Sequence, residues 1–494
     1  MTADTSSDES PTQSAKPTLL RNAEVSPGHH ADVRVASGRI VAVGNALISI
    51  RGEEVVNACG GALLPGLHDH HLHLTALAAV EMSVVCGPPN VRDAATLGVA
   101  LRNRAAALPP GAWVRGIGYH ESVAGLLDRH QLDVLTGDRP VRVQHRGGAL
   151  WIVNSAAAAM LGLDTVSIDA PPGIERDGAG RSTGRLWRLD GWLRRRLDAV
   201  GAVEPEPDLA RVGRRLAAYG ITGVTDATPD MTPGTLRLLL SAVRDGRLPQ
   251  SLLLLGVDSL PSDISTDRVR LGPRKLLPPD HVPWPYDDLL TRIRTARGTG
   301  PVVPRPVAVH CVTLEGLVVA VTALEEAGVV PGDRIEHAAV APPALAAQMA
   351  ALGLRVVTQP GFVAERGDAY RRDADPGDLP YLYPYASLLS AGVPTVASSD
   401  APFGSPDPWA VLRAARDRLA PDGVPLGPTE SVSASTALAG MLSPPLRPGD
   451  ALRSIGPGAP ADLCLLHAPR AVALDEPSAD LVRMTFCDGR IVHV

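Results

Sequence analysis

The stretch LLPGLHDHHLHL, residues 63–74, ends an apolar run with three histidines within four positions. We expect a buried strand here, and side chains two positions apart on a strand point to the same side. His71 and His73 therefore share one face, whereas His70 points the other way. Two imidazoles on one face, just beyond a buried strand, can hold one metal ion. The alternative is a polar loop whose histidines are hydrogen-bonded within the protein.

The chain beyond residue 210 alternates short apolar runs with helical patterns, which is typical of β–α units around a parallel sheet. Besides the run that begins at residue 63, the candidate strands are ITGVTDA (221–227), SLLLLGV (251–257), PRKLL (273–277), RPVAVH (305–310), DRIEH (333–337), LRVVTQP (354–360) and PTVASSD (394–400). Eight strands are what a (β/α)8 barrel needs. The expected fold class is therefore α/β with a TIM-like barrel, although no helix is evident between residues 258 and 272.

The two ends of the chain resemble each other and differ from the middle. Both contain short strands around a turn, at Ser37-Gly38 and at Asp488-Gly489. We expect a disordered tail over residues 1–16, a composite β-sandwich from 17–64 and 438–494, a barrel from 65–80 and 211–437, and an inserted cap over 81–210. The cap segment breaks the β–α alternation directly after the first barrel strand, so it is expected to cover the barrel mouth.

The overall composition narrows the function classes. The chain of 494 residues is 45% hydrophobic and has a formal net charge of −6, so it can bury a sizeable core and gives no reason to expect nucleic acid as a partner. No run approaches the roughly 20 apolar residues that span a bilayer, and the polar first residues do not fit a signal peptide. Five scattered cysteines without a CxxC pattern indicate a reducing cytoplasm. We therefore expect a cytoplasmic protein that acts on a small-molecule substrate, with a homo-oligomer left open.

Polar residues stand at the ends of the expected barrel strands. They are His71 and His73 on the first strand, Lys275 on the fourth, His310 on the fifth, His337 on the sixth, Gln359 on the seventh and Asp400 on the eighth. The C-terminal ends of barrel strands meet at one mouth, where active sites lie. Four histidines, one aspartate and one lysine at that mouth indicate a catalytic metal site.

The motif PGLHDHHLHL, together with VAVH, RIEH and SSDAPFGSPDP, resembles the motifs of the amidohydrolase superfamily. The similarity extends over nearly the whole chain and is strongest to the amidohydrolase-3 group, in its YtcJ-like branch, which is related to N-substituted formamide deformylase. The resemblance implies that His71 and His73 bind the more buried metal. It implies that His310 and His337 hold a second ion or complete the coordination of a single one, and that Asp400 is the metal-linked acid and base. Whichever of His310 and His337 does not bind metal is expected to stabilise the oxyanion.

Lys275 stands where several superfamily members carry a carboxylated lysine that bridges two ions; the alternative is an ordinary lysine. The implied cofactor is a divalent metal, with zinc as the default and one or two ions per chain. The expected function is hydrolysis of a non-peptide C–N bond in an amide, an N-substituted formamide or a cyclic amide by metal-activated water, with Asp400 as acid and base. The alternatives are ester or lactone hydrolysis at the same centre, or a non-catalytic barrel that binds a small molecule.

Residues outside this set also carry expectations. In the cap, His145, Arg146, Trp151, Asn154, Trp187 and Arg188 either face the mouth, where they would suit a substrate with an acidic or aromatic part, or form the cap core. Two positions depart from the branch, because Leu314 and Arg188 stand where relatives often carry acidic residues. Glu336 is expected to point away from His337, as a structural residue or as a partner of a metal ligand. Cys311 is expected to be a buried structural thiol.

Overall fold

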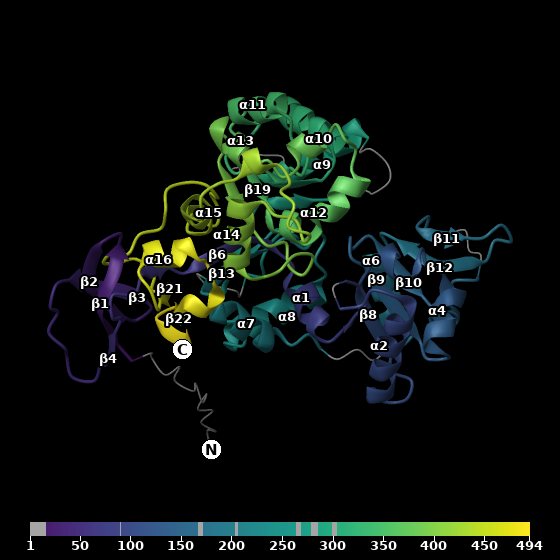
Figure 1. Cartoon of the computed structure of the whole chain (residues 1–494), viewed down its shortest axis with the longest axis horizontal. Helices are drawn as coiled ribbons and strands as arrows, with labels where there is room; N and C mark the ends of the chain where they lie inside the picture. Colours follow the sequence, from purple (N-terminus) through teal and green to yellow (C-terminus); the bar gives the residue numbers. More distant parts are fainter. Residues whose placement is uncertain are drawn as a thin grey trace, which may run out of the picture.

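The computed structural model describes residues 16–88, 90–165, 171–202, 206–262, 268–277, 285–298 and 304–494. Its centre is built from two sheets of parallel strands, in the orders β15-β14-β13-β6 and β16-β17-β18-β19-β20 (Figure 1). The strands are β6 (Leu67–Leu72), β13 (Ile221–Asp226), β14 (Ser251–Leu254), β15 (Val269–Leu271), β16 (Arg274–Leu276), β17 (Val307–Cys311), β18 (Arg334–His337), β19 (Arg355–Thr358) and β20 (Thr395–Ala397). All the expected strands of the middle segment are present, and the α/β class is confirmed. Where no helix was evident, the short strand β15 precedes β16.

Backbone hydrogen bonds join these two sheets at both edges. Lys275 N on β16 donates to Leu255 O beyond β14 (2.9 Å). On the other side Asp400 N, which follows β20, donates to His71 O on β6 (2.8 Å), and His73 N donates to Ala401 O (2.8 Å). The segments that carry the first and last expected site residues are therefore hydrogen-bonded neighbours, although more than three hundred positions separate them in the sequence.

Helices follow most of these strands and cover them from outside. They are α1 (Leu74–Glu81), α7 (Leu209–Ala218), α8 (Pro233–Arg244), α9 (Tyr286–Arg297), α10 (Leu314–Ala327), α11 (Pro343–Ala351), α12 (Gly361–Asp373), α13 (Tyr385–Ser390), α14 (Pro408–Asp417) and α15 (Ala434–Met441). In α10 the buried residues recur at helical spacing, at Leu317, Ala320, Val321 and Leu324, and pack in one apolar cluster with Val307 and Val309 of β17. Burial of one helix face against the strand it follows explains why this alternating sequence folds into layers.

The two ends of the chain lie together. One sheet is β3-β2-β1-β4 and another is β23-β22-β21-β5. Their strands are β1 (Thr18–Ser26), β2 (His29–Ala36), β3 (Arg39–Gly44), β4 (Glu54–Asn57), β5 (Leu63–Pro65), β21 (Leu463–Leu466), β22 (Val482–Cys487) and β23 (Arg490–His493). Leu20, Val33, Leu463 and Phe486 share one apolar cluster, so residues from both termini build a common core. Residues 1–15, most of the expected tail, lie outside the described residues.

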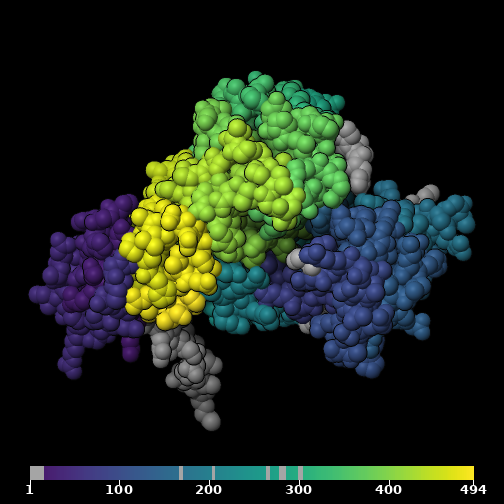
Figure 2. Space-filling model, in the orientation of Figure 1, coloured from purple at the N-terminus to yellow at the C-terminus, as the bar shows by residue number. Residues whose placement is uncertain are grey.

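The segment between α1 and α7 forms a sheet of its own, in the order β11-β12-β10-β9-β8-β7. It consists of β7 (Val84–Val85), α2 (Ala94–Ala107), β8 (Val114–Tyr119), α3 (Glu121–Ala124), α4 (Arg129–Thr136), β9 (Val141–His145), β10 (Leu150–Val153), α5 (Ser155–Leu161), β11 (Ile174–Arg176), β12 (Ser182–Trp187) and α6 (Asp190–Ala199). This blue segment abuts the green part of the chain in Figure 2. In the part of the chain that the structure describes, no helix is both long enough and apolar enough to cross a membrane.

Candidate metal centre

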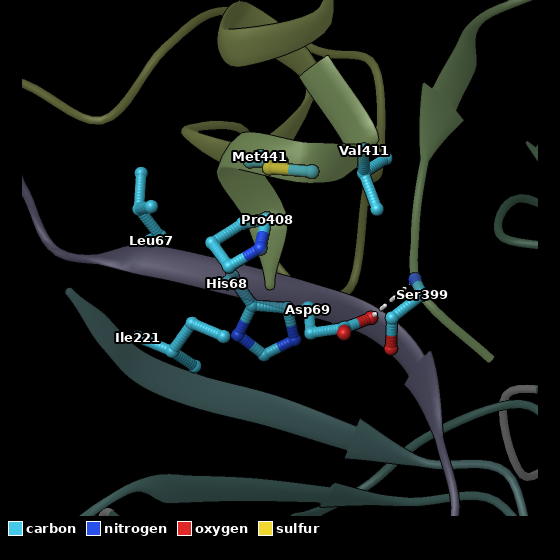
Figure 3. A pocket seen from close by; sticks show the side chains of 8 residues that line it. All are labelled: Leu67, His68, Asp69, Ile221, Ser399, Pro408, Val411 and Met441. Atoms are coloured by element: carbon cyan, nitrogen blue, oxygen red, sulfur yellow. Dashed lines mark hydrogen bonds between the residues drawn. The ribbon is translucent and has the colours of Figure 1, made fainter. Parts of the chain in front are cut away.

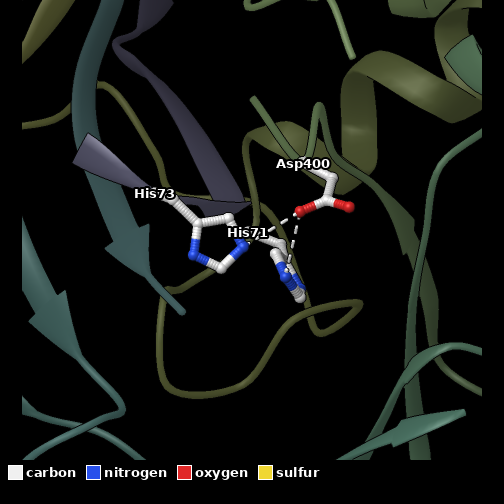
Figure 4. Close-up of side chains that lie close together, drawn as sticks. All are labelled: His71, His73 and Asp400. Carbon is white, nitrogen blue, oxygen red and sulfur yellow. Dashed lines mark ion pairs between the residues drawn. The ribbon is translucent and has the colours of Figure 1, made fainter. Parts of the chain in front are cut away.

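His71, His73 and Asp400 converge at the carboxyl ends of β6 and β20 (Figure 4). Asp400 Oδ1 lies 3.3 Å from His71 Nε2 and 3.2 Å from His73 Nε2. Metal–ligand distances of about 2.0 Å in a tetrahedral site place neighbouring ligand atoms about 3.3 Å apart. The spacing of these three atoms therefore fits three corners of a tetrahedral metal site.

The protonation states of the two histidines support the same conclusion. His71 Nδ1 faces the carboxylate of Glu336, which can only accept a hydrogen bond, so the ring proton of His71 is on Nδ1. Burial lowers the pKa of His71 to about 3, so this ring is neutral and Nε2 carries a lone pair. His73 Nδ1 can donate in the same way to Thr228 Oγ1 (3.2 Å). The Nε2 lone pairs of His71 and His73 then face the buried carboxylate oxygen of Asp400, and a bound cation would stabilise this arrangement.

Glu336 is the residue that orients His71. Glu336 Oε1 accepts a hydrogen bond from Arg334 Nε (2.6 Å), and all three side chains are buried. Burial by itself would raise the pKa of Glu336, but the Arg334 guanidinium, together with His71 and Lys275, outweighs that effect and holds the pKa well below its usual range. Glu336 therefore takes the second of its two expected roles, as the partner of a candidate metal ligand. Its side chain is not turned away from His337 as strand alternation suggested, because His337 has a left-handed backbone (φ 70°) that takes its own side chain out of that alternation.

Glu336→Gln tests this orienting contact. A glutamine retains the size of the side chain but loses the charge that fixes the His71 ring, so affinity for zinc is expected to fall about 10- to 100-fold. The affinity would be measured by titration against a chelator of known strength. Glu326→Gln, which removes a surface carboxylate on α10, is the matched control and should bind zinc as tightly as the parent. Unchanged affinity of Glu336→Gln would contradict the orienting role.

His337 and His310 lie beside the three converging residues. The ring of His337 is 5.0 Å from that of His71 and 4.5 Å from that of His310. Gln359 donates through Nε2 to Ser398 Oγ (3.0 Å), so its Oε1 accepts from His337 Nδ1 (2.7 Å). His337 thus presents the lone pair of Nε2, as His71 does. The side chain of His310 is half-buried, and no hydrogen bond from it is found within the described ranges.

Lys275 completes the set of strand-end residues. Its side chain is buried on β16, and its Nζ has no hydrogen-bond partner within the described part of the chain. Burial lowers the pKa of this amine, and the carboxylates of Glu336 and Asp400 act in the opposite direction. An amine that is buried without a partner is costly, so its presence here is itself a sign of a functional group.

A second layer of contacts ties these strand ends together. Asp69 Oδ1 accepts from His71 N (3.1 Å) and from Ser399 N (3.3 Å), and so links β6 to the segment that carries Asp400 (Figure 3). Asp226, at the end of β13, accepts from Leu74 N (3.0 Å) and from Thr228 N (2.9 Å). Sequence reasoning did not single out Asp226, although its place at a strand end is the signal that identified the other site residues.

The sequence also matches the model of a known protein family. The model of the amidohydrolase family, Amidohydro_3, matches residues 54–299 and 301–493. The chain belongs to the amidohydrolase family. This membership confirms the resemblance of the sequence motifs and supports a hydrolase.

Two relatives and two solved structures are similar to this chain. N-substituted formamide deformylase of Arthrobacter pascens is 27% identical over 457 residues, 82% of this chain and 83% of that protein. The putative amidohydrolase YtcJ of Bacillus subtilis (strain 168) is 30% identical over 138 residues, 27% of this chain and 26% of that protein. The fold is similar to that of an uncharacterized metal-dependent hydrolase from Pyrococcus horikoshii OT3 (TM-score 0.70, 19% identity, 97% of this chain and 100% of that one). It is also similar to that of one from Pyrococcus furiosus (TM-score 0.66, 20% identity, 94% and 100%).

Two of the cap residues lie in the interior of the cap in this amidohydrolase. Trp151 is buried and donates to Asp190 Oδ1 (2.8 Å). Asn154 is fully buried; its Oδ1 accepts from Val141 N (3.0 Å) and from Ala157 N (3.0 Å) at the start of α5. These contacts give both residues a structural role in the cap core.

Asn154→Ala is expected to weaken the cap without touching the metal centre. It leaves buried backbone groups unsatisfied, which costs about 1–3 kcal/mol. We expect earlier thermal unfolding and faster cleavage of the cap in limited proteolysis, with unchanged zinc affinity. Val134→Ala, on the exposed side of α4, is the control and should behave like the parent. A loss of zinc affinity with no change in stability would contradict this assignment.

Trp187 and Arg188 lie at and directly after the end of β12. Trp187 donates to Glu175 Oε2 (2.9 Å) within the cap. Arg188 also has a left-handed backbone (φ 52°), and its charge reaches His310, where it adds to the lowering of the pKa that burial causes first. Arg188 is therefore close enough to His310 for its charge to act there.

A second group of potential ligands, His120, Glu121 and His145, lies in the cap. His145 Nδ1 accepts from Gly147 N (3.1 Å), and His120 Nδ1 accepts from Ser122 N (3.2 Å). Each ring therefore carries its proton on Nε2, the atom that faces Glu121. Metal-binding histidines have the opposite pattern, because their second nitrogen donates a proton to a neighbour. We therefore interpret this group as a hydrogen-bonded carboxylate.

Cys311 is the remaining residue with a sequence expectation. It is buried in an apolar cluster with Leu317 and Val309, and burial raises the pKa of its thiol. A thiol that stays protonated is a poor nucleophile. This placement agrees with the expectation that Cys311 is a buried structural thiol.

Proposed function

We propose that this amidohydrolase is a metal-dependent hydrolase that cleaves a non-peptide C–N bond in an amide, an N-substituted formamide or a cyclic amide. The observation that carries the proposal is the convergence of His71 Nε2, His73 Nε2 and Asp400 Oδ1 at tetrahedral spacing. Similarity to N-substituted formamide deformylase over 82% of the chain supports the formamide as the first substrate to test.

The proposed ligands are His71, His73 and Asp400, joined by His337. Zinc is the proposed ion, because histidine and carboxylate ligands favour it and its coordination can expand to five, which would leave a position for water beside these four residues. His337 is assigned to the ligands because its Nδ1 proton is committed to Gln359 and its Nε2 lone pair is left for a cation. When bound, a divalent ion would polarise the scissile carbonyl and lower the pKa of water to roughly 7.

The chain's own residues would handle the protons. Asp400 would take a proton from the attacking water and deliver it to the departing nitrogen, which is a poor leaving group until it is protonated. His310, which makes no side-chain hydrogen bond within the described ranges, is free to donate to the carbonyl oxygen as negative charge develops there. Glu336 would hold the His71 ring in the required orientation.

Lys275 is proposed to carry a carboxyl group that bridges two ions. Burial favours the neutral amine, which is the form that reacts with carbon dioxide, whereas an ammonium could not bind a cation. In that case the centre holds two ions; with an unmodified Lys275 it holds one.

We propose that the chain is divided into the domains expected from the sequence. The hydrogen bonds at both sheet edges support a (β/α)8 TIM-like barrel from residues 65–80 and 211–437. The shared core of the two ends supports a β-sandwich from residues 17–64 and 438–494, with residues 81–210 as the cap.

The proposed function is tested with N-alkylformamides, lactams and matched formate esters, assayed on zinc-loaded protein and on protein stripped by a chelator. We expect formamide or lactam turnover that disappears with the metal and returns when zinc is added. Turnover of the esters alone would favour the ester hydrolase instead. Binding of these compounds without turnover of any would favour a non-catalytic barrel.

A further inference from the structure

Phe403 lies between the proposed metal centre and the cap. Its backbone N–H donates to Asp400 O (2.8 Å), so the residue belongs to the turn that carries Asp400. Its half-buried ring meets the His73 ring edge-on, with 5.6 Å between the ring centres. Arg366 of α12 donates to Phe403 O and also holds this turn. The ring therefore forms one wall of the site, directly beside a proposed metal ligand.

The cap reaches the same ring through the turn between β9 and β10. This turn begins at Arg146 and contains Gly148, whose backbone is left-handed (φ 78°). A Cβ atom at residue 148 would lie 2.6 Å from Cε1 and 3.0 Å from Cζ of Phe403, which is too close unless the ring shifts. Glycine suits this position because it adopts the left-handed conformation without strain and leaves room for the ring. Cap and barrel strands thus meet at Phe403.

An apolar cluster supports the ring from the barrel. Phe403 packs against a group of buried residues that includes Phe362, Leu382 and Tyr383. The rings of Phe362 and Tyr383 meet edge-on, with 5.8 Å between their centres. Gly404, which follows Phe403, lies against Phe362, because a Cβ atom at residue 404 would be 3.0 Å from Cε1 of that ring. The Phe403 ring is therefore held by the barrel and the cap together.

The proposed roles leave one side of the site for the acyl group of the substrate. The carbonyl carbon carries an oxygen, which would face His310, and a nitrogen, which would face Asp400. Ring centres 4.5, 5.0 and 5.5 Å apart lead in turn from His310 through His337 and His71 to His73. Two rings thus separate His310 from His73. The third substituent of the carbonyl carbon, the acyl group, then points to the His73 side, where the aromatic wall stands.

We propose that Phe403, held in place by Gly148, limits the size of the acyl group, so that the enzyme accepts a formyl group and rejects longer acyl chains. This inference rests on the proposed function and narrows its substrates from amides and lactams to formamides. A methyl group in place of the formyl hydrogen would overlap the ring or displace it from its close-packed neighbours. One such misplaced carbon changes kcat/KM by about 10- to 200-fold in a closely fitting pocket.

The first test uses N-butylformamide, N-butylacetamide and N-butylpropanamide, which share one leaving amine. The measured quantity is the ratio of kcat/KM for the formamide to that for the acetamide, on zinc-loaded protein. Phe403→Ala is expected to lower this ratio at least about 10-fold, and Phe403→Leu to lower it less. Comparison with the parent removes the chemical difference between the two amides. A ratio that stays at the parent value in Phe403→Ala would overturn the proposal.

The control is Val424→Ala, which shortens an exposed apolar side chain and should keep the parent ratio. Because each ratio compares two substrates on one preparation, partial unfolding of a variant does not alter it.

Gly148→Ala tests the contact between the cap and the ring. The apolar cluster fills the barrel side, so the added methyl group is expected to push the ring toward His73 and to raise the ratio about 10-fold. In the Phe403→Ala background the same substitution should leave the ratio unchanged, because the ring that it would meet is absent. The backbone strain of alanine at a positive φ is present in both backgrounds and cancels. An equal effect in both backgrounds would contradict the positioning role of Gly148.

A binding measurement covers the case in which none of the amides is hydrolysed. Formohydroxamate, acetohydroxamate and propionohydroxamate share one metal-binding head and differ in the acyl group alone. In calorimetric titrations of the zinc-loaded parent, affinity is expected to fall about 10-fold or more along this series, and Phe403→Ala should remove the fall. Equal affinity of the parent for all three would overturn the size limit while leaving the hydrolase intact. A protein that binds no zinc would overturn the proposed function and this inference with it.

Discussion

Replacing both His71 and His73 by alanine is expected to abolish tight metal binding. The two residues supply two of the three atoms that converge on the centre, and Asp400 with His337 would be left to hold an ion alone. A loss of two of four ligands lowers affinity by several orders of magnitude in sites of this kind, so the purified double variant should contain essentially no zinc by elemental mass spectrometry. Formamide turnover should fall below detection with it.

The matched control is His29→Ala with His30→Ala, which removes two adjacent histidines from the exposed face of β2. It should retain the full zinc content of the parent. A His71, His73 double variant that is folded by circular dichroism and still holds the parent's zinc would remove these residues from the metal site.

Asp400→Asn is expected to keep the fold and lose most of the turnover. Asp400 has a left-handed backbone (φ 53°), and asparagine is among the few residues that adopt this conformation readily, so the backbone contact of residue 400 with His71 O should persist. The amide cannot accept and return a proton, so kcat should fall about 10²- to 10⁴-fold. The measurement is kcat on the best formamide or lactam at saturating zinc.

Asp373→Asn, at the exposed end of α12, is the control and should be fully active. Zinc content is measured on both variants, because a drop in turnover that follows loss of metal has a different cause from loss of the base. Asp400→Asn with bound zinc and near-parental kcat would remove Asp400 from proton transfer.

Much of the fold could be predicted because its signals are local. Short apolar runs such as SLLLLGV and RPVAVH are buried between layers and are too short for helices, and the strands β14 and β17 form there. The turns at Ser37-Gly38 and Asp488-Gly489 also form, with left-handed backbones at all four positions. Strand ends then identified the candidate site, because parallel strands bring their carboxyl ends to one edge.

The site features that could not be predicted from the sequence arise from departures from regular strand geometry and from contacts between distant segments. Strand alternation placed Glu336 away from His337, and only the left-handed backbone at His337 brings both to the site. Thr228, which supports His73, follows another strand, and nothing local marks it. Asp226, which holds the residue after His73, is the last residue of that strand and so carried the same strand-end signal as the other site residues.

The central claim is that His71, His73 and Asp400 share one metal ion. Anomalous diffraction at the zinc absorption edge, on crystals of zinc-loaded protein, tests it most directly. We predict a peak within about 2.0–2.2 Å of His71 Nε2, His73 Nε2 and an oxygen of Asp400. A second peak next to Lys275 would indicate a second ion that carboxylated Lys275 bridges to the first. Fully loaded crystals with no peak between these three residues would contradict the metal centre and the function proposed from it.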